Sequence, residues 1–250
     1  MNPAIPSQVP ALLLAAGRGE RMRPLTDACP KPLLEVQDKP LLQWHLQALE
    51  RGGFHDVVIN TAWLGEQIAA RFGARWPGGD VRPLALRYSH EGVDFGRALE
   101  TAGGIVRALP LLGEVFWVAA GDVFMPGFAF TQAAAERFAA SGKLAHLWLV
   151  PNPAHNPRGD FGLSEGGLAL NVTSGPRLTY STVGLYRAAL FAPPYCDIAP
   201  GNAAGIGAPL APLLRAAMDN GQVSAELYTG AWTDVGTPER LAQLNASHAP

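Results

Sequence analysis

Apolar and polar positions in the first 150 residues follow two periods that alternate along the chain. Short apolar runs predict buried strands, and stretches with apolar residues three or four positions apart predict amphipathic helices. The predicted strands cover residues 9–16, 56–60, 84–88, 115–120 and 144–150. The predicted helices cover residues 40–51, 62–72, 102–109 and 129–140. This alternation predicts an α/β fold, in which a Rossmann-like, doubly wound and mostly parallel sheet carries helices on both faces.

The pattern changes after Val150, where residues 151–176 are rich in proline, glycine and asparagine. Two strand-like pieces predict a small antiparallel β portion, so the sheet as a whole is expected to be mixed. A helix, a strand and a last helix follow. These later elements cover residues 168–172, 177–186, 208–219 and 222–228 and the segment from Pro238.

Length and composition narrow the class of protein. A chain of 250 residues without repeats suits one domain, and we expect it over 1–250, with a core at 9–150 and a second portion at 151–250. The 48% apolar and 16% charged residues exclude a disordered chain, and the net charge of −2 lacks the basic footprint of a nucleic-acid-binding protein. Two cysteines, Cys29 and Cys196, are too few for a disulfide scaffold.

No apolar run reaches the roughly 20 residues that a membrane-spanning helix needs. The apolar run at 11–17 has no basic residue before it, so we interpret it as a buried strand rather than a signal peptide. We therefore expect a cytoplasmic protein that does not bind membranes. The sequence leaves open a monomer or a small homo-oligomer.

A glycine loop follows the first strand directly. Gly17 and Gly19 allow a tight turn whose N–H groups face an anion. The loop is neither a dinucleotide fingerprint, which needs glycine where Met22 stands, nor a P-loop, which needs Gly-Lys-Ser/Thr. Its basic content suits a polyphosphate, and the alternative is a solvated surface turn. The basic residues are Arg18, Arg21, Arg23 and, just beyond, Lys31.

Lys31 stands between Pro30 and Pro32, which restrict the backbone on both sides. Only three of the nineteen basic residues are lysines, which points to a need for a compact ammonium at this position. Taken alone, the position also fits an ordinary exposed lysine in a turn.

Two aspartates follow strand-like segments. Asp122 comes just after the apolar run 115–120, and the carboxyl ends of parallel strands are where such sheets bind ligands. Asp234 lies between a predicted strand and the last helix. Two carboxylates brought together by the fold could hold Mg²⁺ with phosphate oxygens, although each also fits a turn or cap.

Four blocks together resemble the sugar-1-phosphate nucleotidyltransferase family. They read L-A-A-G-R-G-E-R-M-R-P-L-T at 14–26, P-K-P-L at 30–33, G-D at 121–122 and W-T-D-V-G-T at 232–237. Their order and spacing are those of the family. The resemblance implies the nucleotide-diphospho-sugar transferase type of fold and an enzyme that uses Mg²⁺, a nucleoside triphosphate and a sugar 1-phosphate. It also implies that residues 9–150 bind the nucleotide and that 151–250 bind the sugar.

The same resemblance implies roles for individual residues. Arg21 and Lys31 would be the catalytic cations, and Asp122 and Asp234 would hold Mg²⁺. The nucleotide-binding residues would be Ala15, Ala16, Gly17, Gly19, Glu91, Thr101 and Gly103. Glu91 stands where relatives have a glutamine that reads the base, so its carboxylate would accept a hydrogen bond from the uracil N–H. On the sugar-phosphate side, Arg158 and Asp160 stand near the place where many relatives have a Glu-Lys pair, and this departure leaves the sugar open.

Further stretches, including those at 59–65, 88–92 and 99–104, are similar to members that take N-acetylmuramic acid 1-phosphate in peptidoglycan recycling. The expected reaction is uridylyl transfer from UTP to that acceptor. Mannose-1-phosphate guanylyl transfer and glucose-1-phosphate uridylyl or thymidylyl transfer are the near alternatives. A non-catalytic nucleotide-binding module is a more distant one, and Met22 and the arginine-rich loop disfavour a Rossmann-type oxidoreductase.

Overall fold

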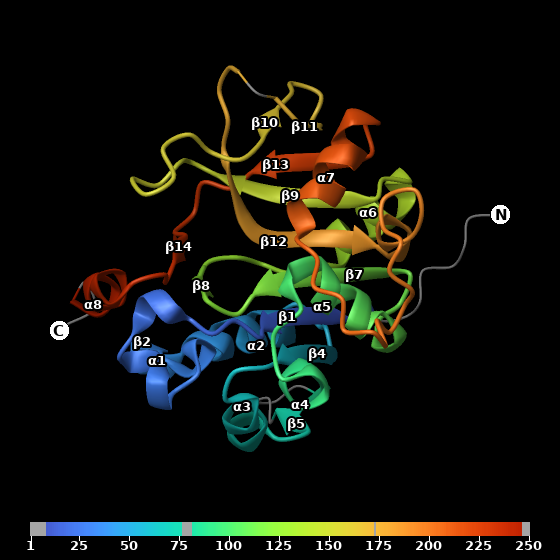
Figure 1. Ribbon diagram of the computed structural model, residues 1–250. Coiled ribbons are helices and arrows are strands. Elements are labelled where there is room, and N and C mark those ends of the chain that lie inside the picture. The colour runs from blue at the N-terminus through green and yellow to red at the C-terminus, as the bar shows by residue number, and fades with distance from the viewer. Residues whose placement is uncertain (1–8, 77–81, 173, 247–250) are drawn as a thin grey trace.

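The computed structural model describes residues 9–76, 82–172 and 174–246, so residues 1–8 and 247–250 of the expected domain lie outside the description. Its centre is an eight-stranded sheet with the order β13-β9-β12-β7-β1-β4-β6-β5 (Figure 1). The strands are β1 (Ala11–Ala15), β4 (Asp56–Thr61), β5 (Arg75–Trp76), β6 (Leu84–His90), β7 (Val115–Ala120), β9 (Ala145–Val150), β12 (Thr179–Arg187) and β13 (Val223–Leu227). Strand β1 pairs in parallel with both β4 and β7, and β4 pairs in parallel with β6.

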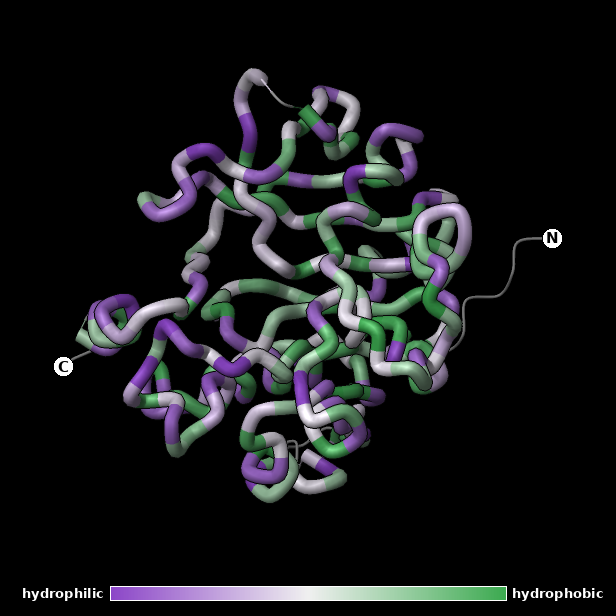
Figure 2. Tube along the Cα trace, viewed as in Figure 1, coloured by the Kyte–Doolittle hydropathy of each residue, from purple (hydrophilic) through white to green (hydrophobic). Residues whose placement is uncertain are grey.

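Helices cover both faces of the sheet because the central strands are apolar on both sides. In β1, Leu13 packs into the core on one face and Leu12 into the core on the other. The first core includes α2 (Leu41–Arg51), α3 (Gly65–Phe72) and α6 (Gln132–Ser141), and the second includes α5 (Glu100–Ala108) and α7 (Leu210–Asp219). The apolar stretches lie mostly inside these layers and the polar ones in the outer loops (Figure 2). The mostly parallel α/β prediction is confirmed.

The antiparallel portion differs from the prediction in one respect. Of the two pieces predicted for it, the one at 168–172 contains β11 (Ala169–Leu170), which forms a separate antiparallel pair with β10 (Gly162–Leu163). The piece predicted at 177–186 is instead β12, which lies between β7 and β9 in the main sheet and is antiparallel to both. The reason is that β12 is apolar on both faces: Val183 packs into one core and Tyr186 into the other. A strand of that kind is stable only where both faces are covered.

Shorter elements surround the carboxyl ends of the central strands. They are β2 (Glu35–Val36), β3 (Lys39–Pro40), β8 (Val123–Phe124), β14 (Thr233–Asp234), α1 (Leu25–Ala28), α4 (Glu91–Phe95), α8 (Pro238–Ala246) and the 3₁₀ turns η1 (Glu20–Met22) and η2 (Lys31–Leu33). Two further 3₁₀ turns, η3 (Leu109–Leu111) and η4 (Ala188–Phe191), lie at the opposite end of the sheet, because η3 precedes β7 and η4 follows the antiparallel β12. Strand β14 pairs with β8, which brings the late segment beside the end of β7. None of the helices in the described residues is long and apolar enough to cross a membrane.

Candidate functional site

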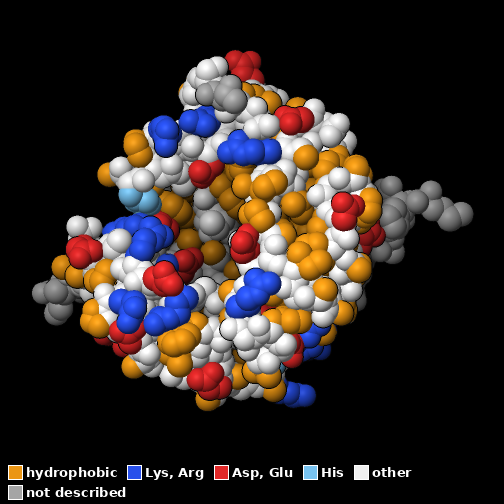
Figure 3. All heavy atoms as spheres, in the orientation of Figure 1, with side chains coloured by type: hydrophobic (Ala, Val, Ile, Leu, Met, Phe, Trp, Pro, Cys, Tyr) orange, Lys and Arg blue, Asp and Glu red, His pale blue; other side chains and the backbone are white. Residues whose placement is uncertain are grey.

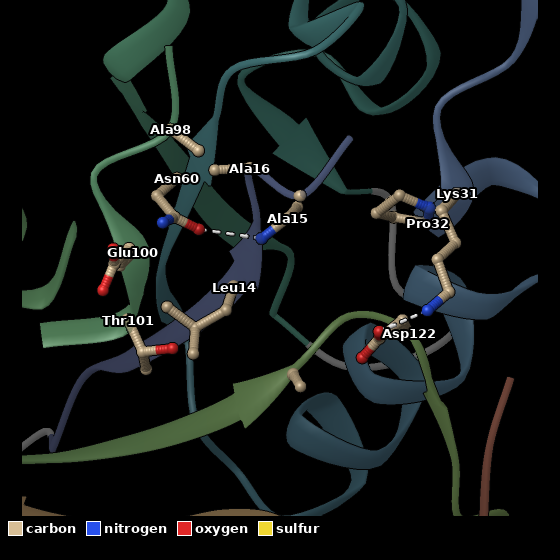
Figure 4. Close-up of a pocket in the computed structure, with 12 residues that line it drawn as sticks. Leu14, Ala15, Ala16, Lys31, Pro32, Asn60, Ala98, Glu100, Thr101 and Asp122 are labelled. Carbon is tan, nitrogen blue, oxygen red and sulfur yellow. Dashed lines mark hydrogen bonds and ion pairs between the residues drawn. The ribbon is translucent and has the colours of Figure 1, made fainter. Parts of the chain in front are cut away.

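A cavity of about 240 Å³ opens at the carboxyl end of the sheet, in the hollow that Figure 3 shows with basic side chains around its rim. Its walls come from the ends of β1, β4 and β7, from η2 and from the start of α5. In Figure 4 the end of β1 lies between Glu100 and Thr101 on one side and Lys31 and Asp122 on the other. Six of the residues singled out in the sequence line this cavity: Ala15, Ala16, Gly17, Lys31, Thr101 and Asp122.

Lys31 is buried, with only 8% of its surface exposed, and its ammonium points at Asp122. The Nζ atom lies 2.5 Å from Oδ2 of Asp122, which joins η2 to the end of β7. Gly19 does not line the cavity and lies beneath the lysine stem. A Cβ added at Gly19 would meet the Cβ of Lys31 at 3.3 Å, and its φ of +67° is one that glycine adopts readily. The prolines and this close approach hold the ammonium at the cavity wall.

The three loop arginines have different surroundings. Arg18 and Arg23 both bind the carboxylate of Asp27, at 3.0 and 2.8 Å, and Arg18 also stacks on the ring of Trp63. The Arg18 guanidinium, with a further contribution from Arg23, lowers the pKa of Asp27 below its usual value. Arg21 is exposed and, within the described part of the chain, has no hydrogen bond or ion pair. Arg21 is thus the loop arginine left available for a ligand.

Glu91 does not face the cavity, in contrast to the expected contact with a base. It is fully buried, and both carboxylate oxygens have partners inside the protein. Oε1 accepts from the side-chain amide of Asn60 at 2.7 Å, and Oε2 accepts from the backbone N–H of Leu99 at 2.8 Å. Asn60, whose other amide atom accepts from the N–H of Ala15, lines the cavity in its place. Glu91 therefore ties together two segments of the cavity wall.

Gly103 also differs from the prediction, because it is buried in α5 and lines neither this cavity nor the one beside it. A Cβ at this position would meet the carbonyl oxygen of Ile206 at 2.4 Å. Its N–H donates to the carbonyl of Ala208. The glycine thus allows the 206–208 segment to approach α5, which is a packing role.

We expect Glu91→Gln to change the pH dependence of stability. Burial raises the pKa of the Glu91 carboxyl above its ordinary value of 4.5. The folded protein therefore holds this proton more tightly than the unfolded chain, so the group's contribution to stability falls as pH rises through the raised pKa. Glutamine does not titrate. The Tm of the wild type relative to the variant should therefore increase as the pH is lowered from above the raised pKa toward the ordinary pKa of 4.5.

The measurement is thermal unfolding of both proteins at a series of pH values from neutral down to the ordinary glutamate pKa. Glu165→Gln, at an exposed position, is the matched control. A Tm difference between wild type and Glu91→Gln that stays constant with pH would contradict the prediction.

A second cavity of about 550 Å³ adjoins the first and shares Leu14, Glu100, Thr101 and Ala120 with it. Asp160, predicted on the sugar-phosphate side, lines this cavity. Its carboxylate accepts from the N–H of Tyr180 at 2.8 Å and from the amide of Asn156 at 3.2 Å. Arg158, the other residue expected there, is exposed and lines neither cavity. The structure thus brings Asp160 to the second cavity and leaves Arg158 outside it.

Backbone pairing brings Asp234 close to Asp122. Asp234 is opposite Val123 in the β14–β8 pair, and the N–H of Val235 donates to the carbonyl of Asp122. The Asp234 carboxylate is paired with His155, at 2.7 Å, and with Arg240. Among the described residues no group of three or more His, Cys, Asp or Glu side chains is assembled as a metal site. Two carboxylates still suit Mg²⁺, which is often held by one or two carboxylates together with substrate phosphates.

Several cavity residues were not singled out from the sequence: Asn60, Glu100, Tyr180, Thr182 and Arg215. Asn60 had a usable signal, since it is a polar residue near the carboxyl end of an apolar strand. Arg215 had no such signal in the sequence. It lies among apolar residues on the predicted helix 208–219, and the groups that surround it belong to segments far away in the chain.

Comparisons with known proteins find matches to both the sequence and the fold. A family model described as nucleotidyl transferase matches residues 10–174. The N-acetylmuramate alpha-1-phosphate uridylyltransferase of Neisseria meningitidis serogroup B is 47% identical over 243 residues, which cover 94% of this chain and 96% of that protein. A glucose-1-phosphate thymidylyltransferase of N. meningitidis serogroup A is 27% identical, over 92% of this chain and 79% of that protein. A solved Bacillus anthracis structure in complex with a sucrose has the same fold, with a TM-score of 0.76 and 18% identity over 96% of this chain and 95% of that one.

Proposed function

The chain belongs to the nucleotidyl transferase family, and from this premise we propose that it transfers a uridylyl group from UTP to N-acetylmuramic acid 1-phosphate, giving the UDP-sugar and pyrophosphate. The observation that carries the proposal is the ion pair between the buried Lys31 and Asp122, in the wall of a cavity that continues into a second one. Two adjoining cavities suit two substrates, and the charged pair lies where phosphates would meet.

The reaction in this proposal is a single in-line displacement. An oxygen of the sugar 1-phosphate forms a bond to the α-phosphorus of UTP, and the bond from that phosphorus to the bridging oxygen of pyrophosphate breaks. The attacking oxygen is already anionic, so no general base is required. The obstacle is the electrostatic repulsion between the sugar phosphate and the triphosphate. It amounts to about 4 kcal/mol for two unit charges 4 Å apart at an effective dielectric constant of 20.

The protein lowers this repulsion with cations of different kinds. The Lys31 ammonium, held by its ion pair and by the prolines on both sides, would stabilise charge on the reacting phosphate. Arg21, free of intramolecular partners in the described residues, would hold the triphosphate. The backbone at Ala15, Ala16 and Gly17, at the end of β1, would contact the nucleotide between these cations and the start of α5. Alignment of the two substrates in adjoining cavities supplies the remaining acceleration.

Asp122 and Asp234 would hold Mg²⁺, which when bound neutralises phosphate charge and orients the reacting group. Binding would require the Asp122 carboxylate to be shared with, or released from, Lys31, and the Asp234 carboxylate likewise from Arg240 and His155. The use of UTP leads us to propose a cytoplasmic location, and the acceptor a role in recycling the sugars of peptidoglycan.

The test is pyrophosphate release across a grid of substrates. UTP, GTP, dTTP and CTP are each combined with N-acetylmuramic acid, N-acetylglucosamine, glucose and mannose 1-phosphates. We expect the highest kcat/KM with UTP and N-acetylmuramic acid 1-phosphate. Activity only with GTP and mannose 1-phosphate would contradict the proposed substrates, and nucleotide binding without pyrophosphate release would contradict the proposed reaction.

A further inference from the structure

Arg215 is a half-buried cation in the wall of the second cavity. It extends from α7 over the ring of Phe161, with the guanidinium carbon 5.1 Å from the ring centroid. One terminal nitrogen donates to the side-chain oxygen of Asn171 at 2.7 Å, and the other lies 3.4 Å from the backbone oxygen of Asp160. The guanidinium is therefore fixed by packing and neutral acceptors.

No carboxylate among the described residues forms an ion pair with Arg215. The obvious partner would be Asp219, four residues further along the same helix. Its two oxygens instead accept hydrogen bonds from the amide of Asn171, at 3.0 and 3.2 Å. Asn171 thus binds the acid with its amide nitrogen and the arginine with its oxygen. The arrangement keeps the two charges apart and leaves the positive charge of Arg215 without an acidic partner in the cavity wall.

The second cavity is otherwise formed largely by apolar and uncharged groups, apart from Asp160 and Glu100. A fixed guanidinium in such surroundings suits a planar anion, because its fork of donors matches a carboxylate. The phosphate of the acceptor is not that anion in the proposed reaction, since it must lie near Lys31 and Asp122, and these residues line only the first cavity. N-acetylmuramic acid carries one further anionic group, the carboxylate of its lactyl ether, which N-acetylglucosamine lacks.

We propose that Arg215 binds the lactyl carboxylate of the acceptor and is the residue by which the enzyme selects N-acetylmuramic acid over uncharged amino sugars. The inference rests on the proposed function, because it assumes an acceptor held between the two cavities. Arg215 has no part in the chemical step, so its contribution is the same in the ground state and the transition state. Its loss should therefore raise KM for this acceptor more than it lowers kcat.

The experiment compares Arg215→Met with the wild type on N-acetylmuramic acid and N-acetylglucosamine 1-phosphates, with UTP saturating. We expect kcat/KM for the first acceptor to fall by about 10- to 100-fold, the value for the second to change less than about twofold, and KM for UTP to stay unchanged. Arg215→Lys keeps the charge and loses the planar fork, so its kcat/KM for the first acceptor should lie between those of the wild type and Arg215→Met. Arg137→Met, exposed on α6 across the sheet, is the matched control and should behave as the wild type.

Calorimetric binding of the two UDP-sugar products gives a readout that does not depend on turnover. The wild type should bind UDP-N-acetylmuramic acid more tightly than UDP-N-acetylglucosamine, and Arg215→Met should remove that preference. Equal losses for both acceptors, or a preference that survives in Arg215→Met, would overturn the role of Arg215 while leaving the proposed function standing. A wild type that releases no pyrophosphate with N-acetylmuramic acid 1-phosphate would instead contradict the proposed function itself.

Discussion

Replacing Lys31 with methionine is expected to lower kcat for pyrophosphate release by about 10²- to 10³-fold, the loss typical of removing one preorganised group that stabilises transition-state charge. The lysine is suited to this role because it is 8% exposed and held at the cavity wall by Asp122. In such a partly desolvated position an ammonium acts more strongly on a phosphate than it would in water. Methionine keeps an unbranched stem of similar length, so the change removes the charge with little change in packing.

Folding and activity can be separated in this variant. The Asp122 side chain is 39% exposed, so it remains solvated after its partner is removed, and we expect the Tm of Lys31→Met to stay close to that of the wild type. Lys143→Met is the matched control, because Lys143 lies just before β9, at the other end of the sheet, and its ammonium binds the carbonyl of Gly221. A rate within a few-fold of the wild type would show that Lys31 does not contact the reacting phosphates.

The second large effect is expected for Asp122→Asn, which should lower Mg²⁺-dependent turnover by about 10³-fold or more, or about 4 kcal/mol in the activation free energy. Asparagine keeps the shape of the side chain and can still accept a hydrogen bond from Lys31, but it lacks the negative charge that a divalent cation requires. The variant should therefore need a higher Mg²⁺ concentration for half of its maximal rate. The measurement is pyrophosphate release as a function of Mg²⁺ concentration.

Asp197→Asn, at an exposed position outside both cavities, is the control for loss of one acidic charge. Thermal unfolding of Asp122→Asn should match that of the wild type, since the side chain is partly solvated and its backbone contacts with β14 are retained. Near-native rates with an unchanged Mg²⁺ dependence would mean that Asp122 is not a metal ligand, and the role proposed for Asp234 would then lose its main support.

Local patterns were sufficient for much of the fold. The alternation of apolar runs and amphipathic stretches located the central strands and their helices within a few residues, because those patterns depend on neighbours along the chain. The place of β12 could not be read in this way. Its nine residues suggested a strand, but only the packing of Val183 and Tyr186 on opposite faces put it between β7 and β9.

The candidate site likewise has features that the sequence predicts and features that only the structure shows. By itself, the sequence determined the family, the glycine loop at the end of β1 and the positions of Lys31 and Asp122, because these features lie in short continuous blocks. Only the tertiary structure decided that Glu91 is buried behind Asn60 and that Arg215 reaches the second cavity without an acidic partner. The physical reason is that burial and pairing depend on contacts between segments far apart in the chain, such as Asn60 with Glu91 and Arg215 with Asn171, and no local pattern specifies them.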